Sequence, residues 1–386
     1  MKTFAKALNL IKKTLRGSLL EKPKRLVVLM LLLFSAAVYL TARFSVGFAE
    51  FWARYPSASL RYILAKVTSL FPFSLAEVLI IASAAGVVII CLALLFAIFR
   101  KKPRSPLLKK SAKCAACIAL AVAFTFLLGF GPLYFRKTLP ENLSLEKEPL
   151  SGEMLYETAV WLAGEIDKLI PFISFAASGE SHMPYSFDRL ETLVNRAFAD
   201  FAKDKAFLGM FTSRVKPVAL SNLMTYTHIS GVYTFFTGEA NVNVNYPDFI
   251  IPFTIAHEMA HQRGIAREDE ANFVAFLVCV NSGDPYIRYS GYINVLNEVT
   301  PALYSADKQL YKDFRNNYYG EKIADEMSAY SVFFEKYRKS PAAKVVTKTN
   351  NAFLSSQKVD SGVKSYGLVA DLAAAYYKAV IGNNAN

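Results

Sequence analysis

The sequence predicts a membrane-anchored α+β protein that is mainly helical, with three N-terminal transmembrane helices followed by a domain with a small sheet. Its 386 residues are 53% hydrophobic and their mean hydropathy is positive, which is too apolar for an ordinary soluble protein of this length. Three segments of about 20 apolar residues account for the excess. Helical spacing dominates the remainder, and one short stretch has the composition of strands and turns.

The three apolar segments lie at about residues 26–48, 78–99 and 114–135. They lack a polar face along their length, so membrane spans are a better interpretation than buried core helices. The first is too long for a cleaved signal peptide and more spans follow it, which indicates an uncleaved anchor. Between the first two spans, residues 47–77 mix aromatic and basic side chains, as an interfacial or re-entrant segment would.

These observations divide the chain into three parts. Residues 1–135 form a membrane domain, residues 136–150 have the short, polar and proline-bounded character of a linker, and residues 151–386 form the outer domain. Within the outer domain we expect a polar loop at residues 344–362. Helical spacing predicts helices at residues 151–170, 187–211, 267–280, 287–299, 301–318, 323–337 and 365–380.

Charge predicts the orientation in the membrane. Through Phe135 the chain has 19 basic and 3 acidic residues, whereas from Arg136 onward it has 25 basic and 28 acidic residues. Because Lys and Arg accumulate on the cytoplasmic side of spans, we expect a multi-pass protein of the cell membrane with a cytoplasmic N-terminus and an extracytoplasmic catalytic domain. Basic clusters that flank spans favour contact with the lipid bilayer over contact with nucleic acid.

Residues 218–245 have the strand and turn composition. From Glu239 to Asn245 polar and apolar residues alternate strictly, so Glu239, Asn241 and Asn243 share one face. One interpretation is an exposed sheet edge on which an extended peptide substrate would bind. The other is a plain solvated hairpin.

Two of the four histidines lie in the five-residue stretch His257-Glu258-Met259-Ala260-His261. Residues i and i+4 of a helix project from one face, so His257 and His261 can share one Zn²⁺ ion while Glu258 reaches the metal-bound water. Pro252 suits the first turn of such a helix and Gly264 suits its end. The competing interpretation is a chance match in an ordinary buried helix, which occurs in about one chain in a hundred of this length.

A catalytic zinc site usually has three protein ligands and an open position for water. Candidates for the third ligand are the acidic residues after the Gly264 turn and two distant histidines: Glu268, Asp269, Glu270, His182 and His228. Glu268 is favoured over the alternative Glu270, because Asn272 lies one helical turn after Glu268 and could hydrogen-bond an imidazole ligand from behind. Acids at a helix N-terminus also complement the macrodipole without any metal, and this explanation covers at least one of them.

In such a site zinc lowers the pKa of its bound water and polarises the scissile carbonyl, while Glu258 takes the proton and passes it to the leaving amine. A further donor would stabilise the negative charge that develops on the carbonyl oxygen. With 21 tyrosines in the chain, the sequence singles out none of the candidates, which are Tyr226, Tyr289, Tyr292 and His228.

Three stretches carry a resemblance to a known family. They are Gly238-Glu239-Ala240-Asn241-Val242-Asn243, then His257-Glu258-Met259-Ala260-His261-Gln262-Arg263-Gly264, and then Glu268-Asp269-Glu270-Ala271-Asn272-Phe273. With the chain length and the leading spans, they resemble an uncharacterised family of bacterial membrane proteins, a domain of unknown function that carries an HExxH motif. The resemblance implies a metallopeptidase without implying a substrate.

More remotely, Glu268-x-x-Ala271-Asn272 is similar to the ExxxD or ExxAD element of gluzincins, whose first glutamate binds zinc and whose last acid orients a histidine. Here Asn272 stands in place of the acid, and only six residues separate His261 from Glu268, fewer than gluzincins have. Gly264 is similar to the turn glycine of the metzincin motif HExxHxxG, but Arg267 stands where the third metzincin histidine would be. The resemblance implies a zincin-like metallopeptidase domain.

The sequence therefore predicts a membrane-anchored zinc metallopeptidase with one Zn²⁺ ion, acting on peptides or proteins of the cell envelope at the outer face of a bacterial membrane. An intramembrane protease is a second hypothesis, which the polar residues flanking the HExxH helix disfavour. A non-proteolytic zinc-binding membrane sensor or envelope assembly factor is a third, which the intact Glu258 disfavours. Ligands of this kind also bind other divalent ions.

Overall fold

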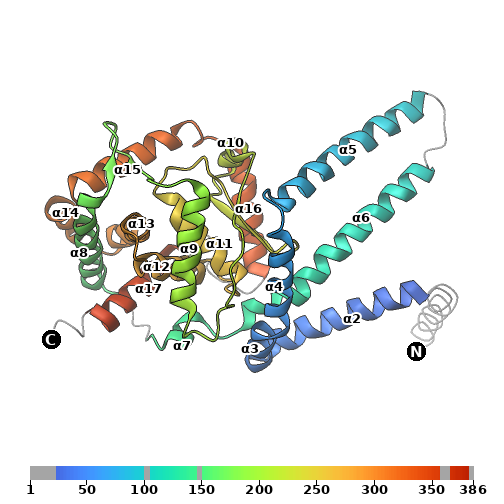
Figure 1. The fold of residues 1–386 in the computed structure, drawn as a ribbon, viewed down its shortest axis with the longest axis horizontal. Helices are drawn as coiled ribbons and strands as arrows, with labels where there is room; N and C mark the ends of the chain where they lie inside the picture. Colours follow the sequence, from blue (N-terminus) through green and yellow to red (C-terminus); the bar gives the residue numbers. More distant parts are fainter. Residues whose placement is uncertain (1–22, 100–104, 146–149, 357–365, 382–386) are drawn as a thin grey trace.

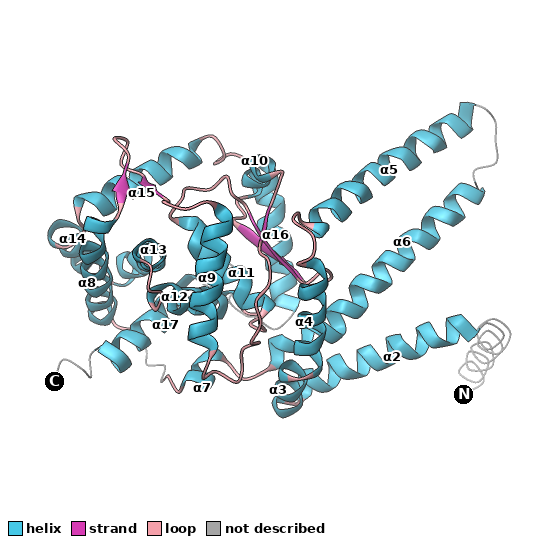
Figure 2. Ribbon diagram, in the orientation of Figure 1, coloured by secondary structure: helices cyan, strands magenta, loops and turns pink. Residues whose placement is uncertain are grey.

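The computed structural model describes residues 23–99, 105–145, 150–356 and 366–381. The fold is mainly helical with two small sheets (Figure 2). Three long helices project from one side of a helical body formed by residues 150–381 (Figure 1). Elements far apart in the sequence meet where the three helices join this body.

Among the described residues, three helices are long and apolar enough to cross a membrane, as expected for the three predicted spans. The first is Leu26–Phe44, within α2 (Pro23–Phe44). The second is α5 (Leu75–Phe99). The third, Pro106–Phe135, comprises nearly all of α6 (Ser105–Thr125), the π-helical η1 (Phe126–Phe130) and the 3₁₀ turn η2 (Gly131–Phe135). Most basic residues that predict the orientation belong to residues 1–22 and 100–104, outside the described residues, so sidedness stays a prediction.

Two short helices fill the segment between the first two spans. Ser45 caps α3 (Val46–Arg54), and Pro56 occupies the first turn of α4 (Pro56–Thr68), where its missing N–H costs no hydrogen bond. The buried faces of both helices carry mostly small residues, together with Glu50 and Arg61, whereas large apolar side chains on their other faces are exposed. This amphipathic arrangement is the one expected of an interfacial segment.

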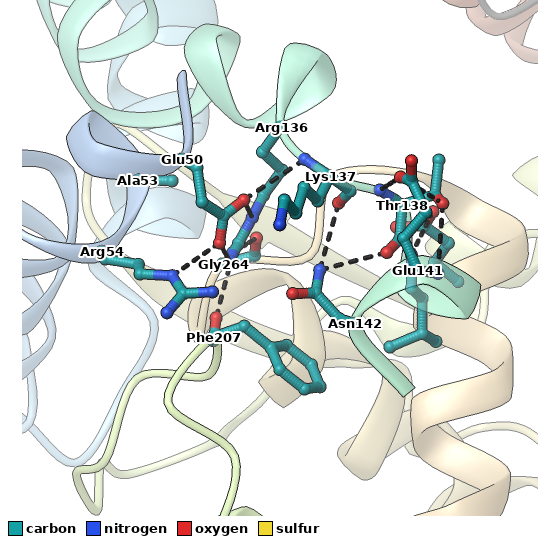
Figure 3. Close-up of polar contacts among 12 residues, drawn as sticks. Glu50, Ala53, Arg54, Arg136, Lys137, Thr138, Glu141, Asn142, Phe207 and Gly264 are labelled. Atoms are coloured by element: carbon teal, nitrogen blue, oxygen red, sulfur yellow. Dashed lines mark hydrogen bonds and ion pairs between the residues drawn. The ribbon is translucent and has the colours of Figure 1, made fainter. Parts of the chain in front are cut away.

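The stretch expected to be a linker is instead packed against both neighbours over its described part. Arg136 is buried and pairs with Glu50 of α3 at 2.7 Å. It also donates to the carbonyls of Phe207 and Gly264, both at 3.0 Å (Figure 3). The short helix α7 (Leu139–Leu143) follows, with a capping box at its start. Residues 146–149 lie outside the described residues. The polar residues that suggested a linker are used as buried contacts between the spans and the body.

The expected small sheet has three strands in the order β3-β5-β4. Strand β5 (Glu239–Val242) pairs parallel with β3 (Lys216–Pro217) and antiparallel with β4 (Gly231–Thr234), with Tyr233 opposite Ala240. Gly238, at a φ of 72°, starts the return strand. A Cβ on Gly238 would lie 2.6 Å from Leu64 of α4, so the turn needs glycine for both reasons. A separate hairpin pairs β1 (Ser174–Phe175) with β2 (Ser181–His182).

The core of the body lies between α11, α12 and α13, which pack on one another and on α8 and α9. Most of the expected helices are present, with shifted ends. The helices of the body, apart from single turns, are α8 (Gly152–Leu169), α9 (Phe187–Ala202), α10 (Ser221–Met224), α11 (Ile250–Gln262), α12 (Glu268–Val280), α13 (Pro285–Ala306), α14 (Lys308–Asn317), α15 (Glu321–Glu335), α16 (Pro341–Ser356) and α17 (Tyr366–Tyr376), which continues into η6 (Tyr377–Ile381).

Two expectations about the body are wrong. The polar loop expected at residues 344–362 is helix α16 as far as Ser356, and the rest of that range lies outside the described residues. The break expected before Pro301 is absent, because Pro301 lies inside α13. A proline within a helix removes the hydrogen bond to the carbonyl four residues earlier. That residue is the exposed Asn297, whose carbonyl water can hydrate.

Candidate metal centre

Helix α11 and the turn after it position the predicted ligands. The helix contains His257, Glu258 and His261 and ends at Gln262. Gly264 has a φ of 112°, which reverses the chain into α12. Helix α12 begins at Glu268. The reversal therefore brings the first side chain of α12 back beside the last turn of α11.

The three ligand atoms converge. The Nε2 atoms of His257 and His261 are 3.0 Å apart, and Oε2 of Glu268 lies 3.3 Å from the first and 3.4 Å from the second. Ligands bound to zinc at about 2.0–2.1 Å in tetrahedral geometry are about 3.3 Å from one another. These three residues could therefore hold one metal ion, and the group includes the favoured third ligand, Glu268.

The surroundings of the two imidazoles fit this role. Nδ1 of His261 lies 2.8 Å from the carbonyl oxygen of Ile265. A proton on Nδ1 would donate to that carbonyl and leave Nε2 free to bind a cation. Nδ1 of His257 is buried and has no hydrogen-bond partner among the described residues. Two imidazoles and one carboxylate with an open fourth position are the donor set of a catalytic zinc site, and they also suit other divalent ions.

The three side chains also interact strongly through their charges. Burial alone would raise the pKa of Glu268, but the neighbouring His261 and His257 outweigh burial and lower it. Burial lowers the pKa of His261, but the charge of Glu268 outweighs that effect and raises it to about 9. The ionised Glu268 thus attracts positive charge to the point where the three side chains meet.

Glu258 lies directly beside this point in a buried environment. It is 3% exposed, and burial raises the pKa of its carboxyl group above the ordinary value. Its Oε2 has no hydrogen-bond partner among the described residues. A buried carboxylate with a free oxygen and a raised pKa is suited to take up and release a proton.

Strand β4 is the element that passes next to Glu258. A Cβ on Gly231 would lie 2.5 Å from Oε1 of Glu258 and 2.6 Å from the side chain of Thr254. The backbone of Tyr233 forms a hydrogen bond with Glu258. Sequence reasoning missed β4, although a glycine inside a strand is a signal for the close approach of another group.

The three residues expected on a substrate-binding edge are elsewhere. Strand β5 is the central strand of its sheet and is buried throughout, so the exposed-edge interpretation is wrong. Glu239 accepts hydrogen bonds from the backbone of α5, Asn241 donates to the carbonyl of Val232, and Asn243 donates to Thr225. The strict alternation therefore reflects buried polar contacts on the polar face. The solvated-hairpin interpretation is also wrong, because the polar face is covered.

The alternative ligand Glu270 and the expected supporting residue Asn272 do not take the predicted roles. Glu270 accepts a hydrogen bond from the backbone of Leu139 at 2.9 Å, and burial raises its pKa to about 7. It is absent from the converging group, so the alternative third ligand is not supported. Asn272 was expected to hydrogen-bond an imidazole ligand. The carbonyl of Ile265 has this position beside His261 instead.

The remaining candidates make contacts away from the converging group. Tyr289 donates to Glu326 at 2.8 Å, and Tyr292 packs against Trp161. Tyr226 packs against Tyr337. The two distant histidines also have other neighbours: Nε2 of His228 lies 2.9 Å from the carbonyl of Tyr337, and Nδ1 of His182 lies 4.0 Å from Asp248.

The C-terminal end of the third apolar helix lies against the converging group, which the sequence did not predict. The ring of Phe130 lies 6.1 Å from the ring of His261 between centroids, and Arg267 donates to the carbonyl of Tyr134. Buried Arg61 of α4 donates to the carbonyl of Gln262 at 3.1 Å, where a cation complements the C-terminal end of α11. The sequence contained no signal that separated Arg61 from the other basic residues of residues 47–77.

One protein family matches residues 54–374, which include α4, the second and third spans, the sheet, and the converging group. The chain belongs to DUF3810, a family described as a protein of unknown function. This confirms the expectation of an uncharacterised family. The DUF3810 match includes two spans together with the body, so the contacts between them lie within the family's own boundaries. No curated protein and no solved structure matches the chain.

Proposed function

We propose that this DUF3810 protein is a membrane-anchored zinc metallopeptidase that hydrolyses peptide bonds at the outer face of a bacterial membrane. The observation that supports the proposal is the convergence of His257, His261 and Glu268 to 3.0–3.4 Å with Glu258 buried beside them. A structural site would need the three ligands but would have no use for a free buried carboxylate next to them.

The side chains divide the work of hydrolysis. His257, His261 and Glu268 hold the zinc ion, which when bound would lower the pKa of a water molecule and polarise the scissile carbonyl. Glu258 accepts the proton of the attacking water and returns it to the leaving amine. Burial raises its pKa above the ordinary value of a carboxyl group, which makes it a better proton acceptor than an exposed glutamate.

Strand β4, and not β5, is the sheet edge on which an extended peptide substrate would bind. It pairs with β5 on one side, and the described residues place no strand on its other side. Val232, in the middle of β4, is 40% exposed. An extended peptide that added to the free side of β4 would pass next to Glu258 and the ligands, with backbone hydrogen bonds giving affinity without requiring one sequence.

A zinc-binding sensor or envelope assembly factor is the alternative, and one set of variants separates it from the enzyme. Full-length protein in detergent would be assayed for bound zinc and for hydrolysis of a random peptide pool. We expect one zinc ion per chain in the wild type and in Glu258→Gln, with hydrolysis at least about 100-fold slower in the variant because general acid–base catalysis is removed. Zinc without hydrolysis in the wild type would favour the sensor.

The ligands are tested with a matched pair of glutamates. Glu268→Gln should weaken zinc binding by more than about 100-fold, since even residues behind the ligands can cost 10–100-fold. Glu270→Gln, two residues later in α12, should leave zinc binding intact because its carboxylate binds the backbone of Leu139. Equal zinc loss in both variants, or a folded wild-type protein that binds no metal, would contradict the proposed site.

A further inference from the structure

The outer ends of the second and third spans are bound to the elements that build the metal centre. At the start of α5, the backbone N–H groups of Leu75 and Ala76 donate to Glu239, the first residue of β5, at 3.0 and 2.8 Å. Glu77 accepts from the backbone of Ala219 and Leu220 at 2.9 and 2.8 Å. The second span therefore begins at the N-terminal end of β5, the central strand of the sheet that packs on α11.

The third span ends against α11 itself. Phe130 lies beside the ring of His261. Arg136, directly after the span, binds the carbonyl of Gly264 in the turn between the two ligand helices and is held there by Glu50 (Figure 3). Because these polar groups are buried, separating the span from the turn would leave them without partners. The metal centre thus has a fixed position relative to the spans.

The lengths of the spans set the height of the metal centre above the membrane midplane. Phe130 follows Lys113, the last basic residue before the apolar part of the third span, by about 17 residues, which rise about 26 Å as a helix. The hydrocarbon core is about 30 Å thick, and any tilt lowers the rise further. Phe130, and with it His261, therefore lies at the outer edge of the hydrocarbon layer.

The second span gives an independent height, which is about 7 Å farther out than that of Phe130 and on the other side of the hydrocarbon edge. Helix α5 has 25 residues and a length of about 38 Å, which exceeds the hydrocarbon core by about 8 Å. If Phe99 marks the cytoplasmic edge, Glu77 lies in the outer headgroup region. The contacts of α5 with Glu239 and Leu220 then place the sheet beside the metal centre at that level.

The elements around the junction of the spans and the body expose apolar side chains, as expected of a surface in contact with the outer lipid headgroups. Apolar side chains are strongly exposed on α3 and α4 and at the turn after α4: Phe51 at 54%, Ile63 at 57% and Leu70 at 80%. Leu223, three residues after the contact of Leu220 with Glu77, is 63% exposed. Large apolar side chains exposed on elements that adjoin the spans are typical of a surface that another apolar phase covers.

From these observations we infer that the metal centre lies at the level of the outer lipid headgroups and that its substrate is the juxtamembrane segment of a membrane-anchored polypeptide. The inference rests on the proposed peptidase function for its chemistry. A peptide bond several residues from the bilayer of an anchored chain reaches the centre without leaving the interface. A peptide bond in a folded envelope domain far from the bilayer does not reach the centre.

The height of the centre is tested without metal or activity. In full-length protein whose four cysteines are replaced by alanine, a nitroxide label would be placed at Val232→Cys on β4, at Leu223→Cys, and at Tyr318→Cys directly after α14, far from the spans (Figure 1). In liposomes, we expect the first two labels to collide more with oxygen than with a polar nickel chelate, and the third label to show the reverse. Equal exposure of all three labels to the nickel chelate would overturn the inference.

The substrate class is tested with one peptide pool in two forms. Random-sequence peptides of 30 residues would be presented to wild-type proteoliposomes either free or anchored by a C-terminal dipalmitoyl group, which gives stable anchoring. We expect the anchored pool to be cleaved at least about 10-fold faster because the enzyme and the peptide share one surface. We also expect the cut positions to cluster within about ten residues of the anchor, with Glu258→Gln inactive.

Tethering alone raises cleavage at every position, so the cut positions decide between the outcomes. Cuts spread evenly along the anchored peptides, or equal rates for both pools, would overturn the substrate class while leaving the peptidase function intact. Absence of cleavage in both pools from zinc-loaded protein would overturn the peptidase function and the substrate class with it. The label experiment still reports the height of the centre in that case.

Discussion

Glu268 and Glu270 show how position within one helical turn decides the role of a side chain. Both belong to the first turn of α12 and both could complement its dipole. Glu268 points back at the histidines, whereas Glu270 points at the backbone of Leu139, which is 131 residues away in sequence. The sequence favoured Glu268 because Asn272, one helical turn later, could hydrogen-bond an imidazole ligand. The carbonyl of Ile265 has that position beside His261 instead. The sequence could not show that the backbone of Leu139 is the hydrogen-bond partner of Glu270, because Leu139 lies in a segment with no recognisable local pattern.

Gly231 is the residue whose substitution tests the position of Glu258. Its missing side chain lets the backbone of β4 pass next to that carboxylate. In Gly231→Ala the new methyl group must displace Glu258 or β4, and we expect peptide hydrolysis to fall by about 100-fold, as a 1 Å misplacement can cause. Zinc content should be retained, because the ligands are on α11 and α12.

The matched control is Gly164→Ala on α8, where a Cβ would meet nothing within 4 Å. Alanine there removes a helix-weakening glycine and should leave hydrolysis unchanged. Full activity in Gly231→Ala would show that β4 does not position the general base. Loss of zinc in that variant would instead place β4 among the supports of the ligands.

Among the elements, α3 and the end of the third span are joined by one charged contact whose strength depends on pH. Burial tends to raise the pKa of Glu50, but its hydrogen bonds and charge interactions with Arg136 and Arg54 outweigh burial and lower it from 4.5. A carboxylate with a lowered pKa in the folded state stabilises that state above its unfolded pKa, and the contribution is lost as the pH falls through the folded value.

We therefore expect Glu50→Gln to lower the free energy of unfolding by about 2–3 kcal/mol at pH 7, the range for hydrogen bonds to charged groups. The difference from the wild type should shrink steadily below pH 4.5. Thermal unfolding of the full chain in a non-ionic detergent across this range measures it. Glu157→Gln, at an exposed position of α8, is the control and should show no such dependence. A constant difference at all pH values would exclude the ionic contribution.

The same elements show which parts of the fold a single sequence can predict. Local periodicity predicted the three spans, the HExxH helix and the small sheet. It could not predict that β5 is central, because alternation reports a polar face without saying what covers it. Here the cover is the N-terminus of a membrane helix more than 160 residues earlier. Arg61, whose contact with Gln262 spans 201 residues, is hidden from local patterns for the same reason.

At the scale of the whole molecule, the membrane part and the body share one core. A cluster of buried apolar residues joins the third span to the sheet and to the turn before α12, through Phe130, Leu133 and Tyr134 on one side and Tyr233 and Ala266 on the other. Several buried polar groups bridge the same boundary. The membrane part and the outer part, which charge and composition predicted, are therefore in direct contact through a shared apolar cluster.

A fragment of residues 136–386 tests whether the outer part needs the membrane part for its stability. It lacks α3, α4 and the end of the third span, so the apolar side of Tyr233 and Ala266 is uncovered and the carbonyl of Gln262 loses Arg61. We expect the fragment to unfold at a temperature well below that of the full chain, or to aggregate, and to bind zinc more weakly because the turn at Gly264 is no longer held.

Substitution of Lys216 measures how much the contact between the membrane part and the body contributes to the free energy of unfolding. Its side chain is fully buried in the full chain, where the ammonium group donates to the carbonyls of Thr68, at 3.0 Å, and Phe71. Lys216→Met removes these charged hydrogen bonds and should cost about 2–3 kcal/mol in the full chain. In the fragment, where those carbonyls are absent and water reaches the ammonium group, the same substitution should cost almost nothing. An equal cost in both proteins, or a fragment as stable and as metal-binding as the full chain, would show that the outer part folds on its own and that the spans are only an anchor.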